Sequence, residues 1–166
     1  GAVPAVGPSD AFLKGAPRPA ELPVITEGES IAVTMDEDGS PSPFTLTLHA
    51  PDQDGDPLTW SIYSGATYGN PAVTSGTGTS QEITYAPIAN FHGTDSFVVR
   101  VIDGVDGGDT ITVNVTINPR NDAPVNTAAP TVSGTHHVGQ VLIAGAGTWN
   151  DSADLMPGTI TFSYQW

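Results

Sequence analysis

From residue 31 onward, apolar and polar side chains alternate with the period of two that β-strands produce. Six runs show this pattern clearly, and their apolar members are Ile31, Val33 and Met35; Phe44, Leu46 and Leu48; Leu58, Trp60 and Ile62; Ile83 and Tyr85; Phe97, Val99 and Val101; and Ile111, Val113, Val115 and Ile117. A weaker run lies at 72–74, and Gly, Pro, Asp, Asn and Ser separate the runs. The pattern therefore predicts seven short strands.

Seven short strands with one apolar face each are typical of an immunoglobulin-like antiparallel β-sandwich. Trp60 lies in the third predicted strand, where that fold usually places a core tryptophan. An open barrel is the structural alternative, because it also has one apolar face per strand. We therefore expect an all-β protein with an immunoglobulin/cadherin-like sandwich at its centre.

The sandwich is flanked by two different segments. Residues 1–23 are rich in proline and predict a linker or N-terminal extension, residues 24–124 form the sandwich, and residues 125–166 predict part of a second Ig-like domain. In that second unit, 138–144 and 159–166 are predicted strands, 145–157 is a predicted loop, and Trp166 would take the core position. About 40 residues are too few to bury a core alone, so we expect this unit to be truncated or completed by another chain. Pro23 and Pro124 are 101 residues apart, which suits tandem sandwich domains.

The composition excludes several classes of protein. The chain of 166 residues has 4 Lys and Arg against 18 Asp and Glu, so its net charge of −14 disfavours nucleic acid and anionic membrane surfaces as partners. No apolar run approaches the roughly 20 residues of a transmembrane helix, so membrane insertion is not expected. The absence of cysteine excludes disulfides, thiolate metal sites and cysteine nucleophiles. Frequent glycine and proline agree with a turn-rich β protein.

The acidic residues avoid the predicted strands and gather in loops at two ends of the predicted sandwich. We name the end formed by the loops at 50–57 and 103–109 the leading pole; its acids are Asp52, Asp54, Asp56, Asp103, Asp106 and Asp109. We name the end formed by 36–42, 90–95 and 118–124 the trailing pole; its acids and amides are Asp36, Glu37, Asp38, Asn90, Asp95, Asn118, Asn121 and Asp122. Each pole thus concentrates carboxylates, and Arg120 is the nearby cation.

Carboxylates a few ångströms apart in water repel each other by about 1 kcal/mol per pair, so a cluster favours a bound cation. Oxygen ligands in loops indicate Ca²⁺ rather than zinc or copper. The competing interpretation is that these Asp and Asn residues simply form turns. An EF-hand starting at Asp52 is excluded, because Pro57 and Tyr63 occupy the positions that need Gly and Glu.

Four motifs resemble the cadherin-like tandem repeats of large bacterial surface and adhesin proteins. They are the segment 44–62 with its Asp-Gln-Asp-Gly-Asp loop, Asn90-Phe-His-Gly-Thr-Asp-Ser-Phe97, Val101-Ile-Asp-Gly104 and Asn121-Asp-Ala-Pro124. They occur in the family's order and cover about residues 21–125. The resemblance implies calcium at domain junctions, with Asp52, Asp54 and Asp103 as ligands at the leading pole and Glu37, Asn121 and Asp122 at the trailing pole. We add Asp56 from the same acidic loop as a further candidate ligand.

The sequence predicts no enzyme. It contains no Gly-x-Ser-x-Gly elbow, phosphate loop or His-Glu-x-x-His motif. Of its four histidines, His49, His92, His136 and His137, the adjacent pair His136 and His137 is expected to lie on the surface. The leading hypothesis is a secreted or cell-surface spacer, stiffened by calcium, whose partners are neighbouring repeats or other copies of the chain. The alternative is a subunit of a self-assembling extracellular fibre completed by strand exchange. A module that binds a surface receptor or glycan through Tyr63 and Tyr68 is the third hypothesis.

Overall fold

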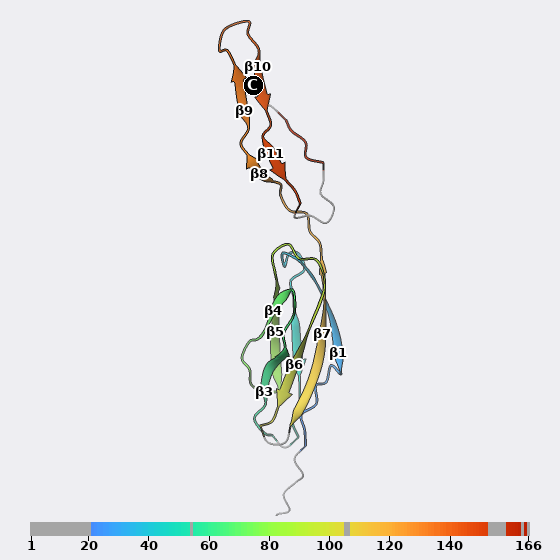
Figure 1. The fold of residues 1–166 in the computed structure, drawn as a ribbon. Coiled ribbons are helices and arrows are strands. Elements are labelled where there is room, and N and C mark those ends of the chain that lie inside the picture. The colour runs from blue at the N-terminus through green and yellow to red at the C-terminus, as the bar shows by residue number, and fades with distance from the viewer. Residues whose placement is uncertain (1–20, 54, 105–106, 153–158, 164, 166) are drawn as a thin grey trace, which may run out of the picture.

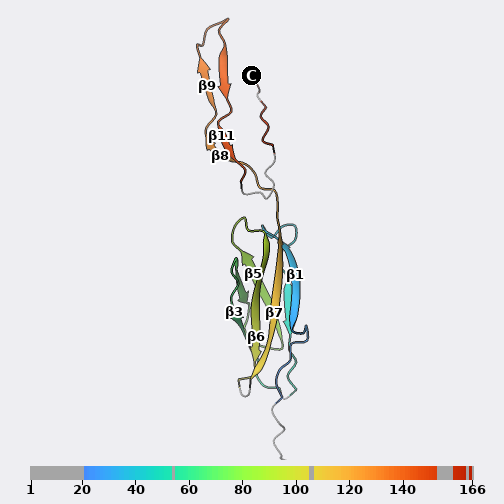
Figure 2. The same ribbon diagram turned by 45° about the vertical axis from the view of Figure 1, so that its right-hand side comes forward.

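A computed structural model describes residues 21–53, 55–104, 107–152, 159–163 and 165 of the chain. These residues form strands, turns and loops, in two units that follow each other along one long axis (Figures 1 and 2). The larger unit is a sandwich of two sheets, and the smaller one is a narrow pair of two-stranded ladders. The residue range 1–20 and Trp166, which carried predictions above, lie outside the described part.

The sandwich contains the seven predicted strands. One sheet has the order β1-β7-β6-β3, with bounds β1 Ser30–Asp36, β7 Gly108–Asn118, β6 Gly93–Ile102 and β3 Thr59–Ser64. The other has the order β2-β5-β4, with bounds β2 Leu46–His49, β5 Ser80–Pro87 and β4 Gly69–Val73. Neighbouring strands are antiparallel except β1 and β7, which are parallel. The predicted all-β sandwich is therefore confirmed.

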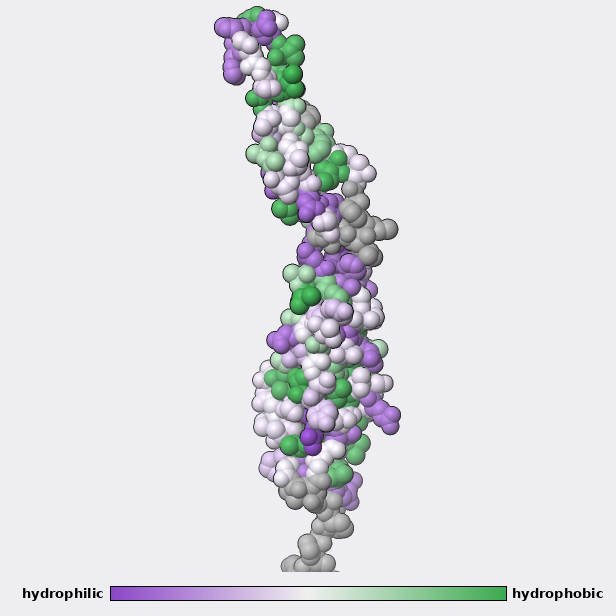
Figure 3. Space-filling model, viewed as in Figure 1, coloured by the Kyte–Doolittle hydropathy of each residue, from purple (hydrophilic) through white to green (hydrophobic). Residues whose placement is uncertain are grey.

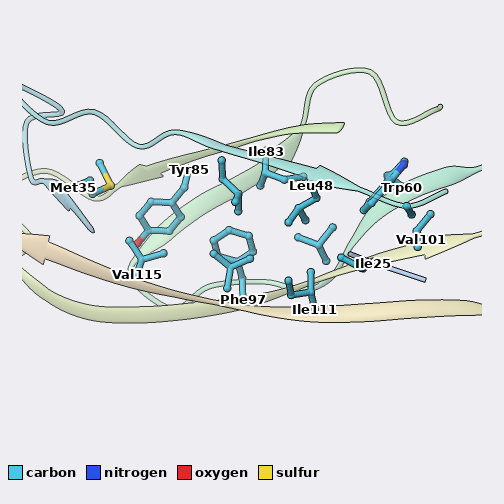
Figure 4. Packing of buried hydrophobic residues seen from close by; sticks show 14 of the residues in the cluster. Ile25, Met35, Leu48, Trp60, Ile83, Tyr85, Phe97, Val101, Ile111 and Val115 are labelled. Carbon is cyan, nitrogen blue, oxygen red and sulfur yellow. The ribbon is translucent and has the colours of Figure 1, made fainter. Parts of the chain in front are cut away.

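The core lies between the two sheets and is built from the alternating apolar positions (Figure 4). Trp60 is 2 % exposed, as predicted, and its indole N–H donates to the Gly78 carbonyl at 2.7 Å. Ile31, Val33, Phe44 and Ile62 are only partly buried and pack at the margin. Ile25, which precedes the first predicted strand, is buried as well, and the alternation pattern did not mark it.

An aromatic stack fixes one end of this core. The rings of Tyr85 and Phe97 lie nearly parallel with their centroids 5.8 Å apart. A Cβ atom at Gly69 would lie only 2.3 Å from the Tyr85 ring, so only glycine lets the ring reach this position. The edge strand β4 therefore packs directly against the stack.

The strand register places the loops at the two expected ends. Ile102 pairs with both Thr59 and Gly108, so the loops at 50–57 and 103–107 meet at the leading pole. Asp36 pairs with Asn118, and Ile117 pairs with Gly93, so the first inter-strand loop and the exit of β7 meet at the trailing pole. The linker at 119–124 leaves from this trailing pole toward the second unit (Figure 1).

The second unit differs in detail from its prediction. β8 (Val125–Ala128) pairs with β11 (Thr148–Asn150), and β9 (Thr131–Gly134) pairs with β10 (Leu142–Gly145). The run predicted at 138–144 starts only at Leu142, because His137–Gln140 closes a tight turn in which the Gln140 N–H donates to the His137 carbonyl at 3.0 Å. The predicted loop at 145–157 contains β11, and the described residues 159–163 lie outside any strand.

Candidate functional site

The trailing pole contains two adjacent buried carboxylates. β1 ends at Asp36, and its parallel pairing with β7 carries Asp36 and Glu37 under the exit of that strand. Asp36 is 0 % and Glu37 6 % exposed. The Glu37 N–H donates to the Asn118 carbonyl at 3.1 Å, which fixes the backbone where the chain leaves β1. Buried carboxylates are unusual and need donors or cations to stabilise them.

Asp36 is supplied with such donors from three directions. Its Oδ2 accepts hydrogen bonds from the Arg120 guanidinium at 2.5 Å and the Ser42 N–H at 3.0 Å, and its Oδ1 accepts one from the Asn118 side chain at 3.2 Å. The guanidinium of Arg120, helped by Asn118 and Ser42 and opposed by burial, lowers the pKa of Asp36 below its ordinary value. Asp36 is therefore an ionised, fully hydrogen-bonded residue at this pole.

Glu37 is satisfied on one side only. Its Oε1 accepts a short hydrogen bond from the Arg120 backbone N–H. Its Oε2 is buried and has no hydrogen-bond partner among the described residues, and the nearest ring nitrogen, Nδ1 of His92, is 3.8 Å away. Within the described part of the chain, the Nδ1 atom of His92 is buried without a hydrogen-bond partner as well. Buried polar atoms are nearly always paired, so this carboxylate oxygen is a candidate ligand for a further group.

The two other predicted residues of this pole lie in the linker. Asp122 is half-buried and Asn121 is exposed. The Asn121 side chain donates to the Asp122 carbonyl at 2.9 Å, so the amide is used locally. The structure thus brings Glu37 and the start of the linker together through Arg120 and leaves the Asn121 side chain on the surface.

At the leading pole, the side chain of the first acidic residue, Asp52, stabilises a turn. The Asp52 Oδ1 accepts hydrogen bonds from the N–H groups of Gly55 at 2.6 Å and Asp56 at 3.1 Å, which closes the loop. Asp103 is 5 % exposed at the start of the neighbouring loop, and Asp56 is half-buried. The predicted ligand Asp54 lies outside the described residues, as does Asp106.

Two acids that were not among the predicted ligands fasten the start of the sandwich. The Asp109 carboxylate accepts hydrogen bonds from the N–H groups of Ile25 at 2.8 Å and Thr110 at 2.7 Å. Glu27 Oε1 lies 2.7 Å from Nδ1 of His49. Partial burial raises the pKa of Glu27, but the hydrogen bonds with His49 outweigh that effect and lower it. Ile25 thus owes its buried position partly to these polar contacts, which link residues far apart in sequence.

Oxygen ligands for a hard cation are present at both poles, yet the described residues do not form a complete coordination sphere. Within the part of the chain that the structure describes, no group of three or more His, Asp or Glu side chains is close enough to hold a metal ion. The orphaned Oε2 of Glu37 is the observation that fits a Ca²⁺ ion, since carboxylate oxygens are its preferred ligands. Water and backbone carbonyls can complete such a coordination sphere.

Asp95 has a structural role that the sequence did not reveal. It was assigned to a loop of the trailing pole, but it lies within β6. Its two oxygens accept hydrogen bonds from the N–H groups of Thr67, Tyr68 and Ser96 and from the Tyr85 hydroxyl, at 2.8 to 3.0 Å. Partial burial raises the pKa of Asp95, but these hydrogen bonds outweigh it and lower the pKa. The carboxylate therefore fastens the β3–β4 connection to β6.

The remaining candidates are surface side chains. His136 and His137 are exposed, as expected, and His49 is exposed next to Glu27. Tyr63 is 64 % exposed with the Arg100 guanidinium 5.7 Å from its ring centroid, and Tyr68 stacks on Phe91 at 4.2 Å. Each of the two exposed tyrosines thus has an aromatic-ring contact with a different neighbour.

The family model described as "Bacterial Ig domain" matches residues 20–116, and the chain belongs to this family. The predicted bacterial Ig-like module is thereby confirmed. Domains of this family are generally non-catalytic, and they usually occur in extracellular or surface proteins. None of the described residues belongs to a helix long and apolar enough to cross a membrane.

Two solved structures with a similar fold are an endo-fucoidan hydrolase of glycoside hydrolase family 107 and the extracellular cadherin domains 3–6 of protocadherin gamma B2. The hydrolase is 19 % identical with a TM-score of 0.47, and the match covers 67 % of this chain and 16 % of that structure. The protocadherin is 22 % identical with a TM-score of 0.47, and the match covers 70 % of this chain and 26 % of that structure. The chain thus spans about a sixth to a quarter of these structures. No curated protein sequence matches the chain significantly.

We predict that Asp95→Asn lowers the free energy of unfolding by about 1–3 kcal/mol at pH 7, because ionised acceptors make the stronger hydrogen bonds. Glu82→Gln is the matched control, since it removes one negative charge from an exposed position on β5. The pKa of Asp95 is lower in the folded state than its ordinary value of 3.8, so its contribution is complete above that pH and is lost as the pH falls through the folded pKa.

Urea unfolding of both variants at several pH values measures this effect. The difference between Asp95→Asn and wild type should shrink as the solution becomes more acidic. Equal stabilities of Asp95→Asn and Glu82→Gln at pH 7 would show that the carboxylate does not fasten the connection.

Proposed function

We propose that the chain is a structural spacer of an extracellular bacterial surface protein or adhesin, in which calcium at the poles stiffens the junctions between domains. The family match and the sandwich fold support the extracellular structural or adhesive role. The elongated arrangement of two units with a short linker between them fits a spacer (Figure 1). The unpartnered Oε2 of the buried Glu37 carries the calcium part of the proposal.

The charge distribution supports a cation at the poles. Eighteen acidic residues against 4 basic ones leave the chain strongly negative, and the acids concentrate where one domain would meet the next. A divalent cation held by Glu37 and the linker residues Asn121 and Asp122 would connect the sandwich to the segment that follows it. Asp52, Asp54, Asp56 and Asp103 are the corresponding proposed ligands at the leading pole.

We expect calcium to raise the melting temperature of the sandwich. With a dissociation constant near 0.1 mM, which is plausible for extracellular modules, about 10 mM calcium adds roughly 2.7 kcal/mol per site. For a domain of about 100 residues this corresponds to a shift of about 10–20 °C relative to excess chelator. Differential scanning calorimetry in calcium, magnesium and chelator measures it.

Variants of the proposed ligands show how much each pole contributes to the calcium-dependent rise in melting temperature. Glu37→Gln should remove the contribution of the trailing pole, and the double variant Asp52→Asn with Asp54→Asn should remove that of the leading pole, while Glu82→Gln should respond to calcium as wild type does. A melting temperature that is the same in calcium and in chelator would contradict the proposal. An undiminished calcium shift in Glu37→Gln would exclude the trailing site alone.

A second candidate function is a subunit of a self-assembling extracellular fibre. The observation that favours it is the second unit, in which several of the described apolar side chains are exposed. Exposed side chains there include Val132 and Ile143, at 63 % and 65 %, and Val141 at 76 %, and apolar surface is visible at this end of the molecule (Figure 3). Strands from a second copy would cover these residues, as in strand addition.

Sedimentation velocity over a wide range of protein concentrations tests the fibre candidate. Self-association should increase with concentration in the wild-type chain, and Ile143→Asp should suppress it because a charge would be buried in the contact. Val138→Asp is the matched control, since Val138 lies in the turn between β9 and β10 and is fully exposed. A wild-type chain that stays monomeric throughout would rule this candidate out.

A further inference from the structure

Arg120 contacts both buried carboxylates of the trailing pole through two different groups. Its guanidinium lies 2.5 Å from Oδ2 of Asp36, and its backbone N–H donates to Oε1 of Glu37. These contacts join residues more than 80 positions apart in the sequence. They are made two residues after β7 ends, where the chain leaves the sandwich.

The protein itself compensates one of the two buried carboxylates at this pole. The structure describes two Lys or Arg side chains: Arg120, and Arg100, whose guanidinium lies over the Tyr63 ring. His92 is the histidine near this pole, with its Nδ1 3.8 Å from Oε2 of Glu37. Arg120 is the one that meets buried acids. Its guanidinium neutralises Asp36 but leaves Oε2 of the adjacent Glu37 without a hydrogen-bond partner. The Asp36 carboxylate is therefore paired with the Arg120 guanidinium, whereas Glu37 has an oxygen that can bind a metal ion.

We propose that Arg120 is a built-in counter-ion of the trailing pole, which holds the exit of the chain in place when calcium is absent and weakens the binding of calcium to Glu37. The weakening of calcium binding rests on the calcium site proposed above, whereas the fixed position of the chain after β7 rests on the observed contacts of Arg120. A unit positive charge on the neighbour of a ligand repels an incoming divalent cation. The same contacts keep the backbone of the linker fixed to Glu37 without any metal.

The physical effect on affinity is moderate. Asp36 and Glu37 are adjacent, so the guanidinium lies within about 10 Å of a cation bound at Glu37. Removing that charge should tighten calcium binding roughly three- to tenfold at low ionic strength, where screening is weak. The trailing site of the wild-type chain therefore needs a higher calcium concentration to fill than the same site without the charge of Arg120.

Calcium titration calorimetry of the full chain tests the affinity. Arg120→Gln, which removes the charge, should bind calcium at the trailing site three- to tenfold more tightly than wild type. Arg120→Lys, which keeps the charge, should stay within about twofold of wild type, and so should the control Arg100→Gln. Weaker or unchanged binding in Arg120→Gln would overturn the counter-ion role.

Thermal unfolding in excess chelator tests the contact itself. Arg120→Gln, Asp36→Asn and the double variant form a cycle in which the double variant should lose less than the sum of the two single losses. Additive losses would show that the contact does not hold the exit. If Asp36→Asn fails to fold, Arg120→Gln must still melt below both wild type and Arg100→Gln in chelator. If neither the wild-type chain nor any variant binds calcium, the calcium site and the effect of Arg120 on its affinity are both overturned. The cycle in chelator still tests whether the Arg120–Asp36 contact stabilises the fold without metal.

Discussion

Two carboxylates buried side by side, Asp36 and Glu37, determine how the chain leaves the sandwich. A buried charge without partners would cost several kcal/mol, so the fold has to bring donors to this place. It does so by pairing β1 in parallel with β7, which brings Asn118 and Arg120 over the end of β1. The position of the linker, and hence of whatever follows it, depends on that arrangement.

Much of the sandwich was predictable because its core obeys a simple rule. Residues that alternate with period two and have one buried face leave little choice of register, since a shift by one residue would expose the whole apolar set. Trp60, Phe97 and Val113 were placed in the core on this ground and are buried. The rule does not reach Ile25, which lies outside the alternating runs. Its N–H donates to the Asp109 carboxylate, and the N–H of the next residue, Thr26, donates to the His49 carbonyl. The rule also does not distinguish a parallel from an antiparallel neighbour, so the β1–β7 pairing was missed.

The candidate site was predictable in outline and not in its contacts. The order of strands in a sandwich brings the acidic loops together at two poles, and the register confirms that part. Which carboxylate oxygens remain available to a metal ion depends on local hydrogen bonds, and the spacing of residues in the sequence does not predict these. Asp52 accepts hydrogen bonds within its own turn, and Asp95 accepts one from the Tyr85 hydroxyl. Arg120 contacts Asp36 and Glu37, which lie more than 80 residues earlier in the sequence. The second unit was predicted least well, because its exposed strands leave no buried face to set their bounds.

The most direct test of this account is the hydrogen exchange rate of the Arg120 backbone amide, measured by NMR in excess chelator. The amide belongs to an exposed linker residue just beyond β7, and a free amide in such a place exchanges rapidly. Because its N–H donates to the buried Oε1 of Glu37, the account predicts slow exchange in the wild-type chain, much slower than at the neighbouring Asn121, and fast exchange in Glu37→Ala. Equally fast exchange at Arg120 and Asn121 in the wild-type chain would contradict the claim that the buried carboxylates hold the exit of the chain.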